Sequence, residues 1–459
     1  MLLADRTLPR ARPTTTSIRR PRLRLGPGWP LWGALVLYPL WWALGLGAFE
    51  FILFAIPMSW MLLKHRPIKL PPGIWIWVAF LIWNVVSLVM LPAHAPGTLD
   101  GSLSGRALSL ALRMIQLATA TVFLLYIVNL TKEELPPRRI LKWMSVLFLV
   151  TVAGGLLALA KPHFEFTSPM ELLLPHHIAT NTYVNTLVHP AAAQVQDVLG
   201  FEAPRPAAPW GYTNLWGNNL SLLLIWFCVY MWEPKVLRSH VRLALVLLVA
   251  LIPVVYSLNR GLWFGVIASI AFIILRLARR GDVRATLITV SAIAVGAILF
   301  LATPLNHVVE QRASHGRSNS IRAFVDDASF RGAVDSPLIG WGDSRKVIGS
   351  SQSIAVGPSE ACPLCGGVNV GSAGEIWLVM FSQGLLGAAM YAGFFAVAWW
   401  RLRFDTSLIG AGARLITILT VFYTFFYNNL PTGLMISMLS IGIASRNLLP
   451  PAPTPAEPA

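Results

Sequence analysis

The sequence has little charge for its length, and negative charge is the scarcer sign. Only 12% of its 459 residues are charged and 55% are hydrophobic, whereas about 25% of the residues of a typical soluble domain are charged. This shortage excludes an ordinary soluble domain. The 36 basic residues outnumber the 20 acidic ones, which gives a formal net charge of +16.

Cysteine is scarce as well, with three residues in the chain. Cys228 lies alone in an apolar stretch, as is typical of a small packing residue. Cys362 and Cys365 form a Cys-Pro-Leu-Cys element, and no second cysteine pair exists to complete a zinc site. We expect this pair to form a disulfide in an oxidising compartment. A metal or redox centre is the alternative interpretation; no metal site is predicted elsewhere.

Long hydrophobic runs make up most of the sequence. A helix needs about 20 apolar residues to cross a bilayer, and a backbone inside lipid must satisfy its own hydrogen bonds, so such runs form helices. The sequence therefore predicts an all-α integral membrane protein, with about 12 transmembrane helices in a membrane domain at 29–447. The predicted spans are 29–47, 48–64, 72–91, 107–130, 140–160, 214–232, 242–258, 260–277, 285–303, 374–400, 408–427 and 432–447. The first two are alternatively one hairpin.

Basic residues occur in every second loop, which indicates the orientation of the spans. They recur in the arm 1–28 and in 64–69, 132–142, 235–242, 276–284 and 401–403. Because basic residues of short loops stay in the cytoplasm, both termini are predicted to be cytoplasmic, including a disordered tail at 448–459. The large loops 161–213 and 304–373 then face outward. The arm lacks aromatic residues, so we expect it to contact anionic membrane lipids and no nucleic acid.

Three ionisable residues stand where charge is costly, which makes them functional candidates. Arg260 lies in a short outward-facing turn, where the charge pattern predicts no basic residue. Binding of an anionic ligand is therefore favoured over the alternative, an arginine that only extends its charge to the membrane interface. Arg113, inside the fourth span, either pairs with a carboxylate or reaches the outer interface. Glu375 opens the tenth span, where the helix dipole also favours an acid.

The two outer loops carry further candidates. Residues 320–334 are predicted to form an amphipathic helix on the membrane surface, with Ile321, Phe324, Val325 and Phe330 on its apolar side. The arginines of this region (Arg317, Arg322 and Arg331) either bind lipid phosphate or pair with Asp326, Asp327 and Asp335 at the surface. In the loop 161–213, Trp210, Tyr212, Asn214 and Asn218 combine aromatic rings and amides. Such a set suits either sugar binding or an interfacial belt.

Several short elements follow one another in a characteristic order. Gly211 and Asn214 open one span, and Arg260-Gly261 forms a turn between two later spans. Arg322 precedes the segment Pro-Leu-x-Gly-x-Gly, and a Gly-Leu-Leu-Gly segment lies in the next span; the glycines and the proline are Pro337, Gly340, Gly342, Gly384 and Gly387. In this order the chain resembles the superfamily of O-antigen ligases and O-antigen polymerases over about 30–447.

The resemblance implies a GT-C-like membrane fold and an activity. Such enzymes take a glycan from a polyprenyl-diphosphate carrier at the outer face of the bacterial cytoplasmic membrane and transfer it to a glycan or glycolipid acceptor. By position, Arg260 and Arg322 would hold the diphosphate, and the ligase branch needs no metal or other cofactor. The two arginines would stabilise the leaving group electrostatically. A base would take the proton of the acceptor hydroxyl, and attack opposite the leaving group would invert the anomeric centre.

The chain departs from the ligase pattern at the base. Ligases carry a His-Asn or His-Ser pair where this chain has Ala373-Gly374, and no histidine follows residue 316. Glu375 is the nearest proton acceptor and becomes the candidate base, with His307 and His315 as weaker candidates. We expect ligase-type transfer, with polymerisation of lipid-linked repeat units as the alternative. A transporter or flippase of a lipid-linked or anionic solute, and a structural membrane protein, are the alternatives from other classes.

Overall fold

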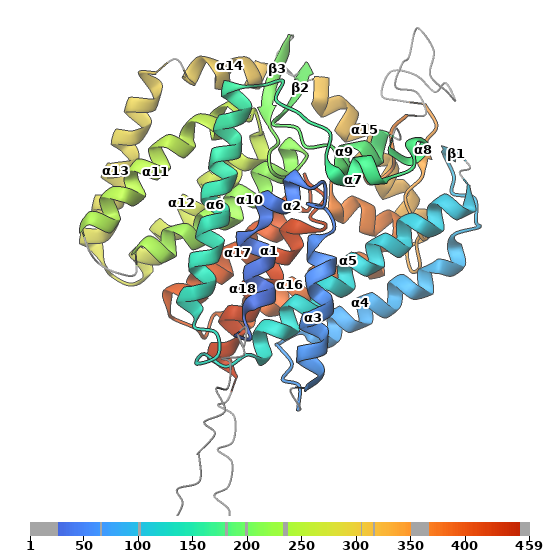
Figure 1. Cartoon of the computed structure of the whole chain (residues 1–459), viewed down its shortest axis with the longest axis horizontal. Helices are drawn as coiled ribbons and strands as arrows, with labels where there is room; N and C mark the ends of the chain where they lie inside the picture. The colour runs from blue at the N-terminus through green and yellow to red at the C-terminus, as the bar shows by residue number, and fades with distance from the viewer. Residues whose placement is uncertain are drawn as a thin grey trace, which may run out of the picture.

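The protein is described by a computed structural model, which is mostly helical (Figure 1). It describes residues 26–64, 67–99, 102–179, 182–197, 201–232, 237–303, 305–314, 317–349 and 367–449. The arm 1–25, the tail from 450 and the pair Cys362 and Cys365 lie outside the described residues, as does His315. Of Arg317 only the backbone is described.

The elements follow the predicted apolar runs closely. In the first half of the chain they are α1 Trp29–Val36, α2 Tyr38–Ala43, α3 Glu50–Lys64, α4 Ile74–Val86, the 3-10 helix Ser87–Met90, β1 Thr98–Leu99, α5 Leu103–Asn129, α6 Pro137–Ala160, α7 Pro169–Leu173, α8 His176–Ala179, α9 Thr182–Val188, β2 Ala193–Asp197 and β3 Glu202–Pro206. Then come α10 Thr213–Trp232, α11 Leu237–Tyr256, α12 Arg260–Arg279, α13 Val283–Leu301, α14 Leu305–Ser314, α15 Arg317–Asp335, β4 Lys346–Val347, α16 Glu375–Leu402, α17 Leu408–Tyr423 and α18 Thr432–Leu448.

Helix length separates these segments into two groups. Within the described residues, six helices are long and apolar enough to cross a membrane: α5, α6, α10, α11, α12 and α16. The apolar parts of α4, α13 and α17 are shorter. The predicted span 29–47 is not one helix, because the chain breaks between α1 and α2 and turns before α3. The chain is therefore a helical membrane protein with at least this set of long apolar helices.

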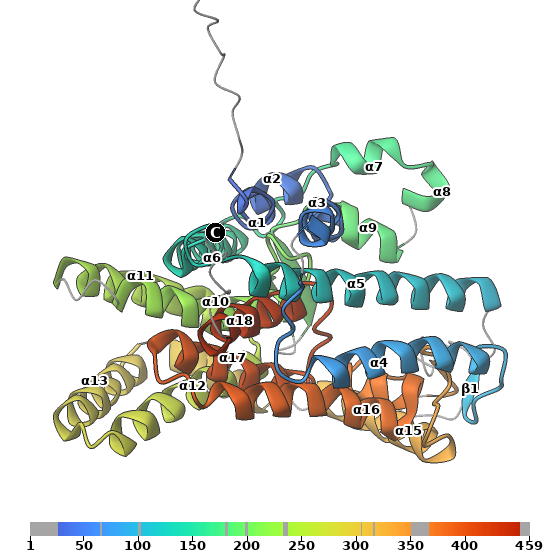
Figure 2. The ribbon, with the colours of Figure 1, turned by 90° about the horizontal axis from the view of Figure 1, so that it is seen from below.

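Two helices occupy the centre of the molecule. In α18 every residue from Thr432 to Arg446 is buried, and α10 buries most of its length. Figure 2 shows them between α5 and α6 on one side and α12, α16 and α17 on the other. Trp226 of α10 donates its indole N–H to the Ser440 hydroxyl of α18 at 2.9 Å. Polar contacts of this kind supplement close packing where helices associate in lipid.

The described ends of the chain lie at one end of the molecule. The Tyr126 hydroxyl donates to the carbonyl of Pro27, and Arg446 donates to the carbonyl of Leu135 at 2.9 Å. The hairpin of β2 and β3, the short helices α7–α9, and α14 lie at the opposite end (Figure 1). The segments predicted as outer loops thus gather away from the two described ends.

A break in α16 anchors the segment 337–342, which belongs to the loop predicted to face outward. Gly384 has a φ of 72° inside the helix, which frees backbone groups on both sides of it. The loop after α15 supplies their partners: the N–H of Trp341 donates to the carbonyl of Phe381 at 3.0 Å, and the N–H of Gly342 to that of Ser382 at 2.8 Å. A broken helix is tolerated in a membrane protein where other protein groups satisfy its backbone, as they do here.

Glycine is required at the contact itself. Gly340 has a φ of 73°, and a Cβ there would lie 2.4 Å from the Gly384 nitrogen and 2.5 Å from the Ser382 carbonyl carbon. The backbones of the two glycine-containing segments therefore touch. The motif after α15 and the motif inside α16, which are separate in the sequence, form one structural unit.

The predicted amphipathic helix exists as α15, and its buried face agrees with the prediction only in part: Val325 is buried and Phe324 is partly buried, whereas Phe330 is not. Val325, Ser329 and Ala333 are buried, and Gly332 lies against Phe381 of α16. Phe330 was placed on the apolar side and is 49% exposed. Small residues lie on the buried face because α15 packs closely against α16.

Candidate functional site

Four arginines from four different elements approach one another at the outer-loop end. Arg260 begins α12, Arg322 lies in α15, Arg312 in α14 and Arg205 in β3. Arg322 is close enough to influence the charge of each of the other three. We call this group the arginine cluster. It includes both residues expected to hold a diphosphate, Arg260 and Arg322, which are far apart in the sequence.

Burial and mutual repulsion make the charge of the cluster costly. Burial, together with the positive charges of Arg312 and Arg322, lowers the pKa of Arg205 to about 10. Burial and the charges of Arg260 and Arg322 lower the pKa of Arg312 to about 10. Like charges crowded in a weakly solvated place favour an anion among them. Both residues stay positively charged at neutral pH.

The turn before α12 holds the two most buried arginines in place. The Arg205 Nε donates to the carbonyl of Ser257 at 2.8 Å, and its Nη1 to the Gln196 side chain at 2.7 Å. The Arg312 Nε donates to the carbonyl of Leu258 at 3.2 Å. Asn259 then caps α12 by accepting from the N–H of Leu262. One short turn thus positions Arg205, Arg312 and Arg260.

Tyr427 contacts the turn from which Arg260 projects. It lies in the segment between α17 and α18 and donates its hydroxyl to the Asn259 side chain. A Cβ at Gly261 would overlap that hydroxyl, which explains glycine directly after Arg260. Arg322 and Arg205 both lie near enough for their charges to act on this hydroxyl.

A second charged group lies inside the helices. The Arg113 guanidinium contacts the Asp343 carboxylate at 3.0 Å and the Ser382 hydroxyl at 3.4 Å. Arg113 also lies near the Glu375 side chain. Of the two interpretations of Arg113, the structure therefore shows pairing with a carboxylate, supplied by the large outer loop.

Glu375 lies between the two groups but is hidden from solvent. It is 1% exposed, and its N–H donates to the carbonyl of Tyr427 at 2.9 Å. Its Oε2 has no hydrogen-bond partner among the described residues. The carboxylate thus has unused hydrogen-bonding capacity. In this structure the carboxylate is shielded from solvent.

The aromatic and amide candidates divide into buried and half-buried residues. Trp210 is buried against Tyr38, with ring centroids 4.3 Å apart, and its indole N–H donates to the Thr151 hydroxyl. The structure gives this ring a packing role instead of an open sugar-binding face. Asn218 is also buried and donates to Asn429 at 2.9 Å. Tyr212 and Asn214 are half-buried at the start of α10.

Arg331 and His307 lie apart from this arrangement. Arg331 forms an ion pair of 2.7 Å with Asp327 on the same helix, and both side chains are largely exposed. For Arg331 the structure therefore shows a surface ion pair, which was one of the two interpretations of the arginines in this helix. His307 lies 3.6 Å from Glu310 and is likewise exposed. Exposed pairs of this kind add little to stability.

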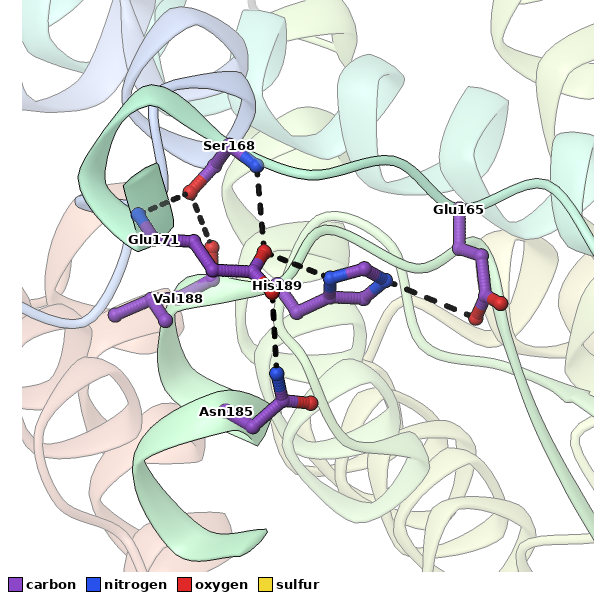
Figure 3. Close-up of polar contacts among 6 residues, drawn as sticks. All are labelled: Glu165, Ser168, Glu171, Asn185, Val188 and His189. Carbon is purple, nitrogen blue, oxygen red and sulfur yellow. Dashed lines mark hydrogen bonds and ion pairs between the residues drawn. The ribbon is translucent and has the colours of Figure 1, made fainter. Parts of the chain in front are cut away.

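A histidine between two carboxylates ties the other outer loop together (Figure 3). The His189 Nδ1 lies 2.8 Å from Glu171, and its Nε2 lies 3.9 Å from Glu165. Glu171 also accepts from Asn185 at 3.3 Å and forms a capping box with Ser168 at the start of α7. These contacts join α7, α9 and the strand region. The described parts of the loop 161–213 are therefore held together by side-chain contacts.

The sequence interpretation missed Arg205, Arg312, Asp343 and Tyr427 as members of these groups. The charge pattern drew attention to Arg260 because it lies in a short turn, but charge counts in long loops carry no orientation signal. Arg205 and Arg312 lie in such loops. Asp343 follows directly on the glycine motif, and only the docking of that motif places it beside Arg113.

Comparison with models of known protein families and with curated proteins finds no match to this chain. Among the described residues, no group of three histidine, cysteine or acidic side chains is placed to hold a metal ion.

Proposed function

We propose that the protein transfers a glycan from a polyprenyl-diphosphate carrier to an acceptor hydroxyl at the outer face of the bacterial cytoplasmic membrane. The arginine cluster carries the proposal, since it combines Arg260 at the end of a long apolar helix with Arg322 of an outer-loop helix. A lipid diphosphate in the membrane presents its charge at that level. In this orientation both termini are cytoplasmic, and the fold is a GT-C-like arrangement of about 12 spans.

The chemistry rests on neutralising the leaving group. As the bond between the sugar and the diphosphate breaks, negative charge grows on the departing phosphate oxygen. Guanidinium groups held in fixed positions stabilise that charge without reorganising, and their planar forks suit phosphate oxygens. Arg205 and Arg312, held by the turn at 257–258, add to the field at Arg260 and Arg322. The protein's own cations thereby supply the charge stabilisation, without a cofactor.

Glu375 is the candidate base. Its carboxylate has an oxygen without a hydrogen-bond partner among the described residues and lies beside Arg113, so it would accept the proton of an acceptor hydroxyl that reaches this buried position. We favour transfer to a separate glycan or glycolipid acceptor, as in O-antigen ligation. Polymerisation of lipid-linked repeat units uses the same donor and differs only in the acceptor.

One observation favours a transporter instead. Broken helices and buried charges mark the binding sites of many secondary transporters, and α16 is broken at Gly384 near the ion pair of Arg113 and Asp343. The backbone groups freed by this break are bonded to the loop at 337–342. The break therefore supports an anchored loop better than it supports a transport pathway.

The test is turnover by the purified protein in liposomes, with a polyprenyl-diphosphate glycan as the donor. Product that forms only after a separate acceptor is added would support ligation, and a ladder of lengthening carrier-linked products would indicate a polymerase. Movement of the donor across the bilayer without turnover would replace the proposal with transport.

Substitutions test whether Arg260 and Arg322 hold the diphosphate, and Arg331, on the same helix as Arg322, provides a matched control. Arg260→Ala and Arg322→Ala should each lower turnover about a hundredfold or more, because each removes one stabilising donor from the transition state. Arg331→Ala, on the same helix as Arg322 but paired with Asp327 at the surface, should leave turnover unchanged. Retained turnover in both Arg260→Ala and Arg322→Ala would overturn the role of the cluster.

A further inference from the structure

A cavity of about 190 Å³ lies between α12 and α17, at the opposite end of these helices from the arginine cluster. Its lining consists of Phe272, Leu275, Arg276, Arg279, Arg280 and Arg414. The side chain of Asn447, near the end of α18, contacts Asp405, just before α17, at 2.7 Å, so the cavity lies on the side that holds the described ends of the chain. On the same scale, one water molecule needs about 10–15 Å³. The cavity therefore has room for a group the size of a phosphate.

Two of the arginines are fixed across the junction of the helices. The Arg276 Nη2 donates to the carbonyls of Thr406 at 2.8 Å and Ser407 at 3.2 Å, and the Arg280 Nη2 donates to Thr406 at 2.8 Å. Arg280 and Arg414 lie near enough to Arg276 for their charges to repel it. The positive charge is thus concentrated by the fold.

One carboxylate, that of Asp405, lies near this group and offsets part of the charge at Arg276. Its oxygens also accept from the N–H of Ser407 and from Asn447. No ion pair joins any of the four lining arginines to a carboxylate within the described part of the chain. Arg414 packs its guanidinium over the ring of Trp399 at 5.1 Å, and its Nε has no hydrogen-bond partner there.

The remaining lining is apolar and lies toward the middle of the helices. Phe272 and Leu275 precede Arg276 and Arg279 by about one helical turn, and Leu275 is 49% exposed. A ligand that fits both parts has an anionic phosphate at one end and a hydrocarbon chain at the other. Basic pockets between helices on the cytoplasmic side suit acidic lipid headgroups in this way.

We propose that this cavity binds the phosphate of an anionic phospholipid from the cytoplasmic leaflet, with an acyl chain along Phe272 and Leu275. The arginines would contact a lipid phosphate and inorganic phosphate in the same way. The apolar wall favours the lipid, because only the lipid has an acyl chain to place there. The site lies apart from the outer-face residues, so it stands independently of the transfer reaction.

The test is native mass spectrometry of the purified full-length protein in detergent, titrated with phosphatidylglycerol, phosphatidylcholine or inorganic phosphate. Phosphatidylglycerol should be retained, and phosphatidylcholine should bind at least about fivefold more weakly for lack of net charge. Inorganic phosphate should not displace the bound lipid. Equal retention of the two lipids would overturn the proposal, and displacement by inorganic phosphate would assign the site to a free anion.

Variants locate the binding. Arg279→Gln/Arg414→Gln removes two lining charges without touching the bonds to Thr406 and should weaken phosphatidylglycerol binding roughly 25-fold, at about fivefold for each arginine near a charged membrane surface. Arg279→Gln alone changes an exposed residue, preserves the fold and should weaken binding about fivefold. Arg238→Gln/Arg242→Gln, in exposed positions on α11, is the matched control and should bind like the wild type. Unchanged binding by both Arg279 variants would place the lipid elsewhere.

Discussion

At the scale of single residues, charged side chains are buried at a cost in free energy, and hydrogen bonds hold them in fixed positions. The sequence identified Arg260 because a short outer turn should not be basic, and it identified Arg322 by the motif that follows it. It gave no sign that Arg205 and Arg312 join them, because only the fold brings β3 and α14 to the turn before α12. Side-chain contacts across such distances in the sequence are not encoded in local composition.

Asp326 offers a pH test of this crowded region. It is half-buried beside Arg322, and burial raises its pKa to about 6 despite that arginine. The unfolded chain titrates near 3.9, so between about pH 4 and 6 the folded state keeps a proton that the unfolded state has lost. Stability therefore falls as pH rises through this window and stays lower above it.

Asp326→Asn should remove this penalty. Because the carboxylate is partly solvated, we expect a gain of about 1 kcal/mol at pH 8, less than the full shift would give, and no gain at pH 4. Thermal unfolding at the two pH values measures it. Asp327→Asn, which alters only a surface ion pair, should change stability by less than about 0.5 kcal/mol at either pH. A less stable Asp326→Asn at pH 8 would contradict the prediction.

At the scale of elements, hydrophobic patterning predicted the helices well but not how the loop meets them. Every predicted apolar run contains a helix, yet the break between α1 and α2 and the break at Gly384 have no hydropathy signal. The glycine motifs were visible as motifs. Their physical reason, two backbones in contact, depends on the third dimension.

Gly340→Ala tests that contact. The new Cβ would carry both the strain of a positive φ and a clash with the backbone at Ser382 and Gly384, so we expect a loss of at least about 3 kcal/mol of stability. Gly97→Ala is the control, since Gly97 has a φ of 70° with nothing within 4 Å of a Cβ and should lose only about 1 kcal/mol. Thermal unfolding in detergent compares them. Equal losses would mean that the docking of the loop adds no constraint.

At the scale of the whole molecule, charge asymmetry predicted which segments share a side. Both described chain ends contact the turn around Leu135, through Gly28 and Arg446. The loop structures gather at the other end, as the alternation of basic loops predicts. Orientation relative to the membrane follows from the sequence pattern alone. That part remains a prediction.

Cysteine labelling tests the orientation. In a Cys362→Ser/Cys365→Ser background, Glu165→Cys should react with a membrane-impermeant maleimide in intact cells, because Glu165 is 64% exposed on the outer-loop side. Arg284→Cys, exposed at the start of α13, should react only after permeabilisation. The reverse pattern would invert the topology and move the arginine cluster to the cytoplasm.

The pairing of Arg113 with Asp343 has a consequence for how the chain is made. The partners are 230 residues apart, and a ribosome adds about 5–20 residues per second. During synthesis α5 therefore enters the bilayer with an uncompensated charge and waits roughly 10 to 50 s before its counter-ion emerges. Over that interval the insertion machinery, or water reached by the arginine itself, must shelter the charge. Biogenesis is thus most vulnerable between the emergence of α5 and the docking of the loop that carries Asp343.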